Sequence, residues 1–466
     1  MCGVIGVYSE LGEDVVGPIL EGLFQMQHRG QDACGVAVSD GKRIALRKDV
    51  GYVRHVFPTP PTTLPGAVGC GHVRYPTAGG NRVQNAQPHV VPALVGAPMG
   101  LASNGDITNY AEARAELEAA GVAFAGTNDA ELIVNTIAFE HHVRGLSLVD
   151  AIRAAQRRLR GAYSSVLVTQ DRMFAIRDPN AIRPLTFGYG EGRWIVASES
   201  SALDTNFADR VDDVAPGEII EFGPSGMVRH PSPDVDAARG RSKPAHCAFE
   251  FVYFSRPDSI TFGRRVYDVR KRIGAWLAAD DPVEVDVVVP VPDSSTSIAM
   301  GYGQERGVPF ELGLIRNHYV GRTFISPDQT RRDEGVRQKF NPIRSVFKGR
   351  RVALVDDSIV RGTTLRKLVR MVRAQGATEV HVRIGSPVTK FPCFYGVDTP
   401  DAGELVGSTN SVYQIREMIE ADTLRYMTTE GLASCIRAEG DFCFACFDGS
   451  YPVPLTEAKF ERGTAS

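Results

Sequence analysis

The second residue of the chain is a cysteine, and its place makes it a candidate nucleophile. Removal of Met1, which is usual before a small residue, would give Cys2 a free α-amino group. Such an amine has an ordinary pKa of about 7.7–8.0, so it can accept the thiol proton near neutral pH. Nucleophile and base would then share one residue, as in N-terminal threonine enzymes. Position alone also fits an ordinary cysteine at a frayed chain end.

Polar residues further along suit the hydrolysis of a glutamine side chain by such a thiol. The planar guanidinium of Arg74 can bind an α-carboxylate, and the carboxylate of Asp129 can bind an α-ammonium group. The side-chain amide of Asn104 and the backbone N–H of Gly105 can offer two converging donors to an oxyanion. Together these residues favour a glutaminase.

A second group of residues suits a phosphorylated sugar. The apolar run Val352–Val355 ends in Asp356 and Asp357, and a Gly-Thr-Thr turn at Gly362 then opens a predicted helix, Leu365–Arg373. Backbone N–H groups and hydroxyls at a helix N-terminus bind anions, and paired carboxylates suit ribose hydroxyls, directly or through Mg²⁺. No G-x-x-x-x-G-K-[ST] string occurs, which excludes a P-loop nucleotidase. Two adjacent acids alone are a weak signal.

Two more segments support a polyphosphate site. The string V-P-V-P-D-S-S at 289–295 follows another predicted strand and suits pyrophosphate with its metal. The segment 316–341 has little apolar periodicity, and beside such a site we predict a lid that orders over substrate. Its basic residues are Arg316, Arg322, Arg331, Arg332, Arg337 and Lys339.

Cys443 and Cys446 form a C-x-x-C motif near the end of the chain. This motif alone fits a zinc site, a redox pair or two buried thiols. With Cys247 and Cys393 it would provide four thiolates, which also suit tetrahedral zinc, so the ligand type does not decide the metal.

Short apolar runs separated by turns and helices fill the first half, which predicts an α+β sandwich. The predicted strands are Val4–Tyr8, Val36–Val38, Ala67–Gly69, Ser165–Thr169 and Ile195–Ala197. The predicted helices are Pro18–Gln27, Glu131–His142 and Leu148–Leu159. A stretch without apolar periodicity at 231–244 is the predicted linker.

The second half carries longer β-branched runs that alternate with helical segments. Three of them are Val285–Val289, Arg351–Val355 and Glu379–Ile384. Continuous apolar strands between helices indicate an open α/β domain with a parallel sheet covered on both faces.

Composition narrows the classes of function. A chain of 466 residues predicts two or three domains. Its net charge of −3 argues against nucleic-acid or membrane-surface binding. The start has neither a secretory signal nor a lipidation pattern, and no apolar stretch reaches about 20 residues. We therefore expect a cytoplasmic protein, whose eight cysteines suggest metal binding or catalysis before disulfides.

Four short strings resemble the N-terminal-nucleophile (Ntn) glutamine amidotransferases. They are M-C-G-V-I-G, Q-H-R-G-Q-D, H-V-R-Y-P-T and S-N-G. The resemblance implies an αββα sandwich in which Cys2 is nucleophile and general base. The oxyanion would be stabilised by Asn104 and Gly105, and glutamine would be held by Arg74, Thr77 and Asp129.

The string V-A-L-V-D-D-S-I-V-R-G-T-T resembles the phosphoribosyl pyrophosphate motif of type I phosphoribosyltransferases. The resemblance implies that phosphoribosyl pyrophosphate is bound by Asp356, Asp357, Ser358, Arg361, Gly362, Thr363 and Thr364. It also implies one Mg²⁺ per subunit beside Ser294, Asp356 and Asp357.

The two halves together resemble the amidophosphoribosyltransferase family over residues 2–455. The resemblance implies an Ntn amidotransferase domain at 2–235 and a type I phosphoribosyltransferase domain at 236–466. Such enzymes carry out the first committed step of de novo purine biosynthesis. They turn glutamine and phosphoribosyl pyrophosphate into 5-phosphoribosylamine, glutamate and pyrophosphate. A homotetramer inhibited by purine nucleotides is also implied.

The surroundings of the four cysteines resemble the iron–sulfur branch of this family. The likeness lies in three strings, which are H-C-A-F-E-F-V-Y-F, F-P-C-F-Y-G-V-D and the terminal C-x-x-C-F before Y-P. It implies a structural [4Fe–4S] cluster on Cys247, Cys393, Cys443 and Cys446.

Two alternatives stand beside this interpretation. Another glutamine amidotransferase, such as the hexosamine-forming kind, shares the first half, but D-D-S-I-V-R-G-T-T argues against it. A non-catalytic relative could sense phosphoribosyl pyrophosphate or nucleotides, but this chain retains the residues that both half-reactions require.

Overall fold

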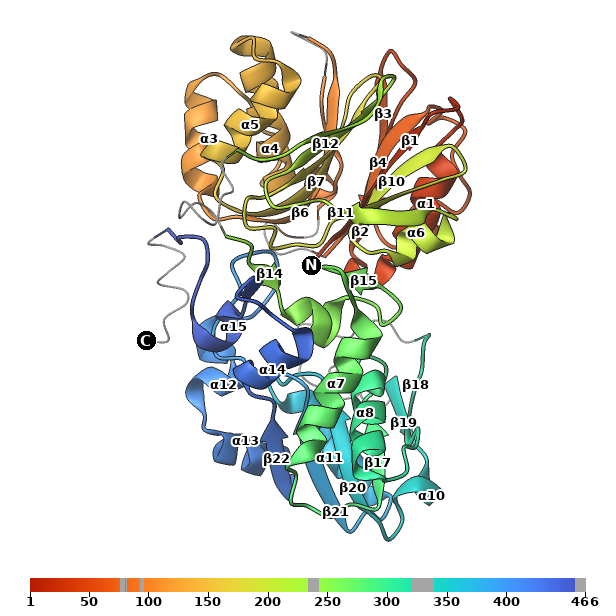
Figure 1. The fold of residues 1–466 in the computed structure, drawn as a ribbon, viewed down its shortest axis with the longest axis vertical. Helices are drawn as coiled ribbons and strands as arrows, with labels where there is room; N and C mark the ends of the chain where they lie inside the picture. The colour runs from red at the N-terminus through yellow and green to blue at the C-terminus, as the bar shows by residue number, and fades with distance from the viewer. Residues whose placement is uncertain (76–79, 81, 93–95, 234–242, 320–338, 457–466) are drawn as a thin grey trace.

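Two antiparallel sheets stack face to face in the first half of the chain (Figure 1). The computed structural model describes residues 1–75, 80, 82–92, 96–233, 243–319 and 339–456. The seven-stranded sheet has the order β11 (Asp209–Asp213), β9 (Thr186–Gly190), β10 (Arg193–Ala197), β1 (Gly3–Ser9), β4 (Val68–Arg74), β2 (Ala33–Ser39) and β3 (Ile44–Val50). The six-stranded sheet has the order β13 (Gly226–His230), β12 (Ile219–Gly223), β8 (Met173–Arg177), β7 (Gly161–Val168), β6 (Met99–Ile107) and β5 (His89–Val91).

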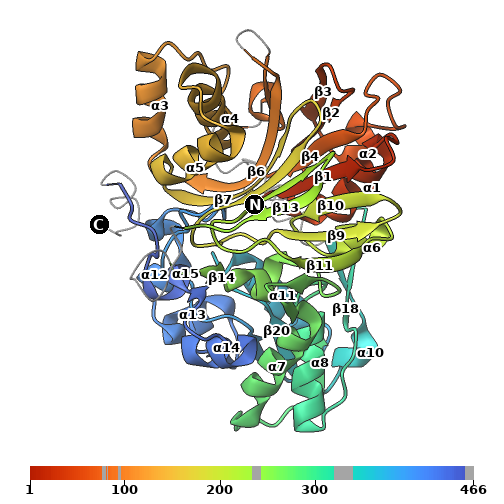
Figure 2. The same ribbon diagram turned by 45° about the horizontal axis from the view of Figure 1, so that its top comes forward.

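Helices cover the outer face of each sheet, as Figure 2 shows. The first sheet is covered by α1 (Val16–Gln25), α2 (Val53–Val56) and α6 (Ser201–Thr205), the second by α3 (Tyr110–Ala119), α4 (Asp129–Ala138) and α5 (Leu148–Arg158). Successive side chains of a strand face opposite sides. Val4 and Tyr8 therefore pack between the sheets, while Ile5 and Val7 pack under the helices. The αββα sandwich is confirmed, and a strand buried on both faces explains the unbroken apolar run at the start of the chain.

A parallel sheet forms the centre of the second half, as expected. Its order is β17 (Val287–Pro290), β20 (Arg351–Asp356), β21 (Glu379–Ile384) and β22 (Thr423–Tyr426). One face is covered by α7 (Val266–Ala279), α8 (Thr296–Arg306) and α14 (Thr429–Ile436), the other by α11 (Thr363–Ala374), α12 (Val406–Thr409) and α13 (Val412–Ile419). Val352 and Leu354 face one layer, and Ala353 and Val355 face the other.

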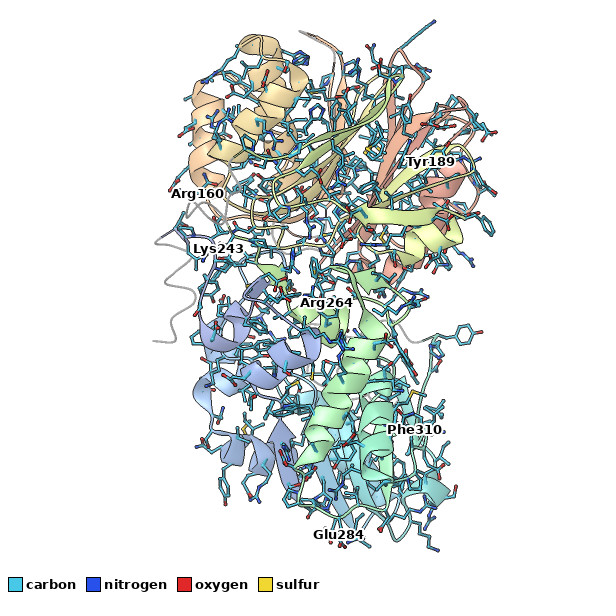
Figure 3. All side chains as sticks on the ribbon, viewed as in Figure 1. Arg160, Tyr189, Lys243, Arg264, Glu284 and Phe310 are labelled. Carbon is cyan, nitrogen blue, oxygen red and sulfur yellow. The ribbon has the colours of Figure 1, made fainter. Side chains whose placement is uncertain are left out.

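Smaller elements join the two halves or flank the parallel sheet. They are the strand pairs β14 (His246–Cys247) with β23 (Phe442–Cys443), β15 (Ile260–Thr261) with β16 (Arg264–Arg265) and β18 (Leu314–Arg316) with β19 (Phe340–Pro342), and the short helices α10 (Arg344–Phe347) and α15 (Ala445–Asp448). Arg264 lies between the two lobes in Figure 3, and its guanidinium carbon is 5.0 Å from the ring centroid of Phe442. Among the described helices, none has the length and apolar character needed to cross a membrane.

The element predictions need three corrections. The strand predicted at Ala67–Gly69 is longer, because β4 extends to Arg74. The predicted helix Glu131–His142 ends as α4 at Ala138 and continues as a wider π turn. The prediction missed β6, because its Gly, Ser, Asn and Asp residues hide the strand pattern. Most of the predicted linker and lid, residues 234–242 and 320–338, lies outside the described residues.

Candidate functional site

The chain begins at the junction of the two halves (Figure 1), and Cys2 lies immediately before the central strand β1. Its backbone nitrogen donates to Oδ1 of Asn104 at 3.3 Å. Its thiol donates to the carbonyl of Tyr75 at 3.6 Å, and Nε of Arg29 donates to its carbonyl oxygen at 3.1 Å. Contacts from three separate segments therefore fix the position of the predicted nucleophile.

The predicted oxyanion residues Asn104 and Gly105 lie in β6, beside Cys2. Asn104 is fully buried, and within the described part of the chain its Nδ2 has no hydrogen-bond partner. Gly105 has a φ of +156°, and a Cβ there would come within 1.8 Å of the carbonyl oxygen of Ala162. Only glycine fits this conformation and this contact. The result is a buried, unused N–H donor next to a thiol, which is what a developing oxyanion requires.

Arg74 and Asp129 face the same pocket as Cys2. Arg74 ends β4, its Nη1 donates to the carbonyl of Gly80 at 2.8 Å, and burial lowers the pKa of its guanidinium. Asp129 begins α4 and accepts from the backbone N–H of Ile107 at 3.3 Å. The pocket is lined by Cys2, Arg74, Tyr75, Gln87, Ser103, Gly105, Thr127, Asn128, Asp129, Ile133 and Ala162. Thr77, the third predicted glutamine ligand, lies outside the described residues.

A second candidate site lies at the carboxyl end of β20. Asp357 is buried, and its two carboxylate oxygens accept from the hydroxyls of Ser294 and Ser358, the latter at 2.6 Å. Burial and the adjacent Asp357 raise the pKa of Asp356 well above its ordinary value, and burial also raises that of Asp357. Two crowded carboxylates with a serine hydroxyl form an oxygen-rich donor set that a divalent cation would stabilise.

The N-terminus of α11 faces the same end of the sheet. Gly362 precedes the helix with a φ of +75°, and Thr363 and Thr364 are its first residues. This turn is an anion site of the predicted kind. Arg361 does not join the acidic residues, because it is exposed and its Nη2 donates to Glu404 at 2.6 Å. Of the basic residues of the predicted lid, Arg316 and Lys339 are described, and Arg316 pairs with Asp293 at 2.6 Å.

The four predicted cluster cysteines come together although they are far apart in the sequence. Cys247 and Cys443 are paired residues of β14 and β23, and the carbonyl of Cys446 accepts from the N–H groups of Lys390 and Phe391. Those two residues lead directly into Cys393. The sulfur of Cys393 accepts from the backbone N–H of Tyr395 at 3.4 Å and from Arg183 at 3.8 Å.

Burial sets the chemistry of these thiols. It raises the pKa of Cys247 to about 11 and those of Cys443 and Cys446 well above the ordinary thiol value. Metal binding would displace these protons, since the thiolate is the ligand. The described residues contain no group of three or more His, Cys, Asp or Glu close enough for a single metal ion. A four-iron cluster needs wider sulfur spacing, because each sulfur binds a different iron.

A buried charge network that the motifs did not predict lies between the halves. Arg29 donates to Glu199 and, at 2.8 Å, to Glu250, and all three side chains are fully buried. Glu199 also accepts from the N–H of Arg256 at 2.9 Å and the hydroxyl of Ser259 at 2.8 Å. Arg29 stands in Q-H-R-G-Q-D and Glu250 in F-E-F-V-Y-F, so both residues belong to strings that the sequence analysis had singled out. That these two residues pair across more than 200 positions could not be seen in the strings themselves.

Comparisons with known proteins agree with both halves. A glutamine amidotransferase domain model matches residues 81–205, and a phosphoribosyl transferase domain model matches residues 258–385. Amidophosphoribosyltransferases of Synechococcus elongatus and Methanocaldococcus jannaschii are 43% and 44% identical. These alignments cover 98% and 99% of this chain and 92% and 99% of the relatives.

Two solved structures share the fold over almost the whole chain. The glutamine phosphoribosylpyrophosphate amidotransferase of B. subtilis, complexed with ADP and GMP, superposes with a TM-score of 0.89 at 40% identity and covers 98% of each chain. A structure described as the allosteric regulatory enzyme of purine biosynthesis gives a TM-score of 0.90 at 39% identity and covers 100% of this chain and 99% of its own.

Proposed function

Since the chain belongs to the amidophosphoribosyltransferase family, which catalyses the first step of purine biosynthesis, we propose that its reaction is divided between the two sites described above. The Cys2 pocket releases ammonia from glutamine. The site at the end of β20 then joins that ammonia to phosphoribosyl pyrophosphate. The observation that carries this division is the hydrogen bond from the backbone nitrogen of Cys2 to Oδ1 of Asn104, whose Nδ2 donor is left unused, in a half separate from Asp356 and Asp357.

In the glutaminase step Arg74 holds the α-carboxylate of glutamine and Asp129 holds its α-ammonium group. After removal of Met1, the α-amine of Cys2 takes the thiol proton, and the thiolate attacks the amide carbon. Nδ2 of Asn104 and the N–H of Gly105 stabilise the oxyanion. Ammonia leaves with a proton returned by the amine, and water then hydrolyses the thioester to glutamate.

Replacing Asn104 by alanine is expected to lower the kcat for glutamine hydrolysis by about 10²–10³-fold, because an oxyanion donor acts mainly in the transition state. Synthesis from added ammonia should keep its wild-type rate. Asn109→Ala is the matched control, since Asn109 is also buried but donates to the carbonyl of Arg158. Steady-state kinetics with each nitrogen donor checks the prediction. An unchanged kcat with glutamine would exclude the oxyanion role of Asn104.

In the transferase step the N-terminus of α11 binds phosphate oxygens of phosphoribosyl pyrophosphate, with Gly362, Thr363 and Thr364 in the turn. Ammonia forms a bond to C1 of the ribose as the bond to pyrophosphate breaks. Asp356, Asp357 and Ser294 would hold Mg²⁺, which would supply positive charge for the departing pyrophosphate. Ser358 orients Asp357 through its 2.6 Å hydrogen bond. Arg361 joins the site when its guanidinium leaves Glu404 and pairs with the substrate instead.

We also assign the chain to the iron–sulfur branch, with a [4Fe–4S] cluster on Cys247, Cys393, Cys443 and Cys446. The support is the convergence of the four thiols and the two N–H donors to the sulfur of Cys393. Hydrogen bonds to cysteine sulfur are a usual feature of such clusters. The cluster stabilises the C-terminal segment against the body of the protein, which is a structural role.

Anaerobically purified protein is expected to be brown, with about four irons and four acid-labile sulfides per chain. Cys446→Ser should lose the colour, because one iron loses its thiolate. Cys435→Ser, the matched control, removes a buried thiol of α14 outside the four and should keep the cluster. Iron and sulfide analysis, together with the visible absorption spectrum, shows whether each protein holds the cluster. Colourless anaerobic protein with stoichiometric zinc would contradict the assignment.

Three further features are proposed from the family. The B. subtilis structure complexed with ADP and GMP supports inhibition of this chain by purine nucleotides. A homotetramer is the proposed assembly. The cytoplasm is the proposed compartment, since its reducing conditions keep the eight thiols available.

A further inference from the structure

Arg183 is a fully buried arginine of the first half that reaches the cysteine segment of the second half. Its Nε donates to the carbonyl of Tyr395 at 2.7 Å, and its Nη2 donates to the sulfur of Cys393 at 3.8 Å. Its Nη1 lies 3.6 Å from Oε1 of Glu250 and 2.8 Å from the sulfur of Met1. One guanidinium therefore contacts a predicted cluster ligand and Glu250, the partner of Arg29.

The segment held by Arg183 continues to the glutamine pocket. Gly396 has a φ of +99°, and a Cβ built there would lie 2.9–3.0 Å from the backbone of Gly105. Residues 393–396 therefore begin at Cys393, a proposed cluster ligand, and end in contact with Gly105, a proposed oxyanion donor. Tyr395 holds the other side of the segment, since its hydroxyl donates to the carbonyl of Val453 at 2.7 Å.

We propose that Arg183 stabilises the iron–sulfur cluster by donating to the sulfur of Cys393, and that it thereby positions residues 393–396 against the oxyanion hole. A cluster ligated by four thiolates carries negative charge, so a buried guanidinium beside one sulfur both compensates that charge and strengthens the N–H···S bond. The inference rests on the proposed function, because it needs the cluster on the four cysteines and Gly105 in the oxyanion hole. Arg183 is a positioning residue, since it touches neither substrate.

The test uses Arg183→Lys and Arg183→Met in the full-length protein. Loss of hydrogen bonds to metal ligands typically costs about 10–100-fold in metal affinity. Under a fixed oxygen concentration, the cluster of Arg183→Met should therefore bleach about tenfold faster than that of the wild type. Arg183→Lys keeps the charge but loses the forked geometry, so its bleaching rate should be intermediate. During bleaching, glutamine-dependent synthesis should fall ahead of ammonia-dependent synthesis.

Arg153→Lys is the matched control, because Arg153 is a buried arginine of the same half that donates to the carbonyls of Gly217 and Pro231. It should retain the wild-type bleaching rate. Equal bleaching of wild type and both Arg183 variants would overturn the proposal, and so would equally fast bleaching of Arg153→Lys. Wild-type protein without iron would instead overturn the cluster assignment itself, so the two failures are distinguishable.

A measurement on wild-type protein keeps the test independent of variant folding. In protein labelled with ¹⁵N-arginine, pulsed electron paramagnetic resonance of the reduced cluster should detect a guanidinium nitrogen coupled to it. Absence of that coupling in a sample with a full cluster signal would also overturn the proposal.

Discussion

Replacement of Cys2 by alanine is expected to abolish glutamine-dependent synthesis, with a fall in kcat of about 10⁴-fold or more, while ammonia-dependent synthesis continues at high ammonia. The reason is that Cys2 supplies the nucleophilic thiol, which alanine lacks although it keeps the α-amine. The acids and the anion-binding turn of the second site lie on β20 and α11, more than 350 residues further along the chain. Initial rates with each nitrogen donor give the two activities.

Cys70→Ala is the matched control for this variant. Cys70 is fully buried between the two sheets and is not among the described residues that line the Cys2 pocket, so its loss should leave both activities near wild type. Circular dichroism establishes that both variants are folded. Equal loss of the two activities in folded Cys2→Ala protein would refute the division of the reaction between two sites.

Replacement of Asp356 or Asp357 by asparagine is expected to reduce synthesis about a hundredfold or more with either nitrogen donor. Each change removes one negative charge from the proposed metal site. The change at Asp357 also weakens its hydrogen bonds with the hydroxyls of Ser294 and Ser358. Glutamine hydrolysis itself should be less affected, because Cys2, Arg74 and Asp129 are untouched.

Asp286→Asn serves as the control for charge removal. Asp286 precedes β17 at the opposite end of the same sheet, where it pairs with Arg351 at 2.9 Å. Its loss should leave the kinetics unchanged. Rates measured against phosphoribosyl pyrophosphate and Mg²⁺ concentration check the prediction. Wild-type turnover and apparent affinity in both acidic-site variants would show that these carboxylates do not serve the substrate.

Long apolar runs were the part of the fold that the sequence predicted best. The run Glu379–Ile384 coincides with β21, and Arg351–Val355 lies within β20, because buried parallel strands need side chains that are apolar on both faces. Strands with one exposed face or with several polar and glycine residues carry a weaker pattern. That is why β6, with Asn104 and Gly105, was missed as a strand although both residues were assigned a role.

Contacts between the halves were the part that could not be predicted. Arg29 and Glu250 stood in recognised strings and Arg183 stood in none, but nothing local to an arginine or a glutamate indicates which charge it will pair with in the folded protein. Burial of such groups is tolerated only where partners meet them, so their pairing depends on the whole fold. The convergence of four cysteines was inferred from resemblance for the same reason.

The proposed activity couples, within one chain, glutamine hydrolysis to transfer of the released nitrogen onto phosphoribosyl pyrophosphate. The decisive measurement is the release of glutamate and pyrophosphate by the purified wild-type protein. The protein is supplied with glutamine, phosphoribosyl pyrophosphate and Mg²⁺. We predict glutamine-dependent release of both products in a one-to-one ratio, with 5-phosphoribosylamine formed in equal amount. Glutamate release without pyrophosphate, or no turnover of either substrate by folded protein, would rule out this coupled activity.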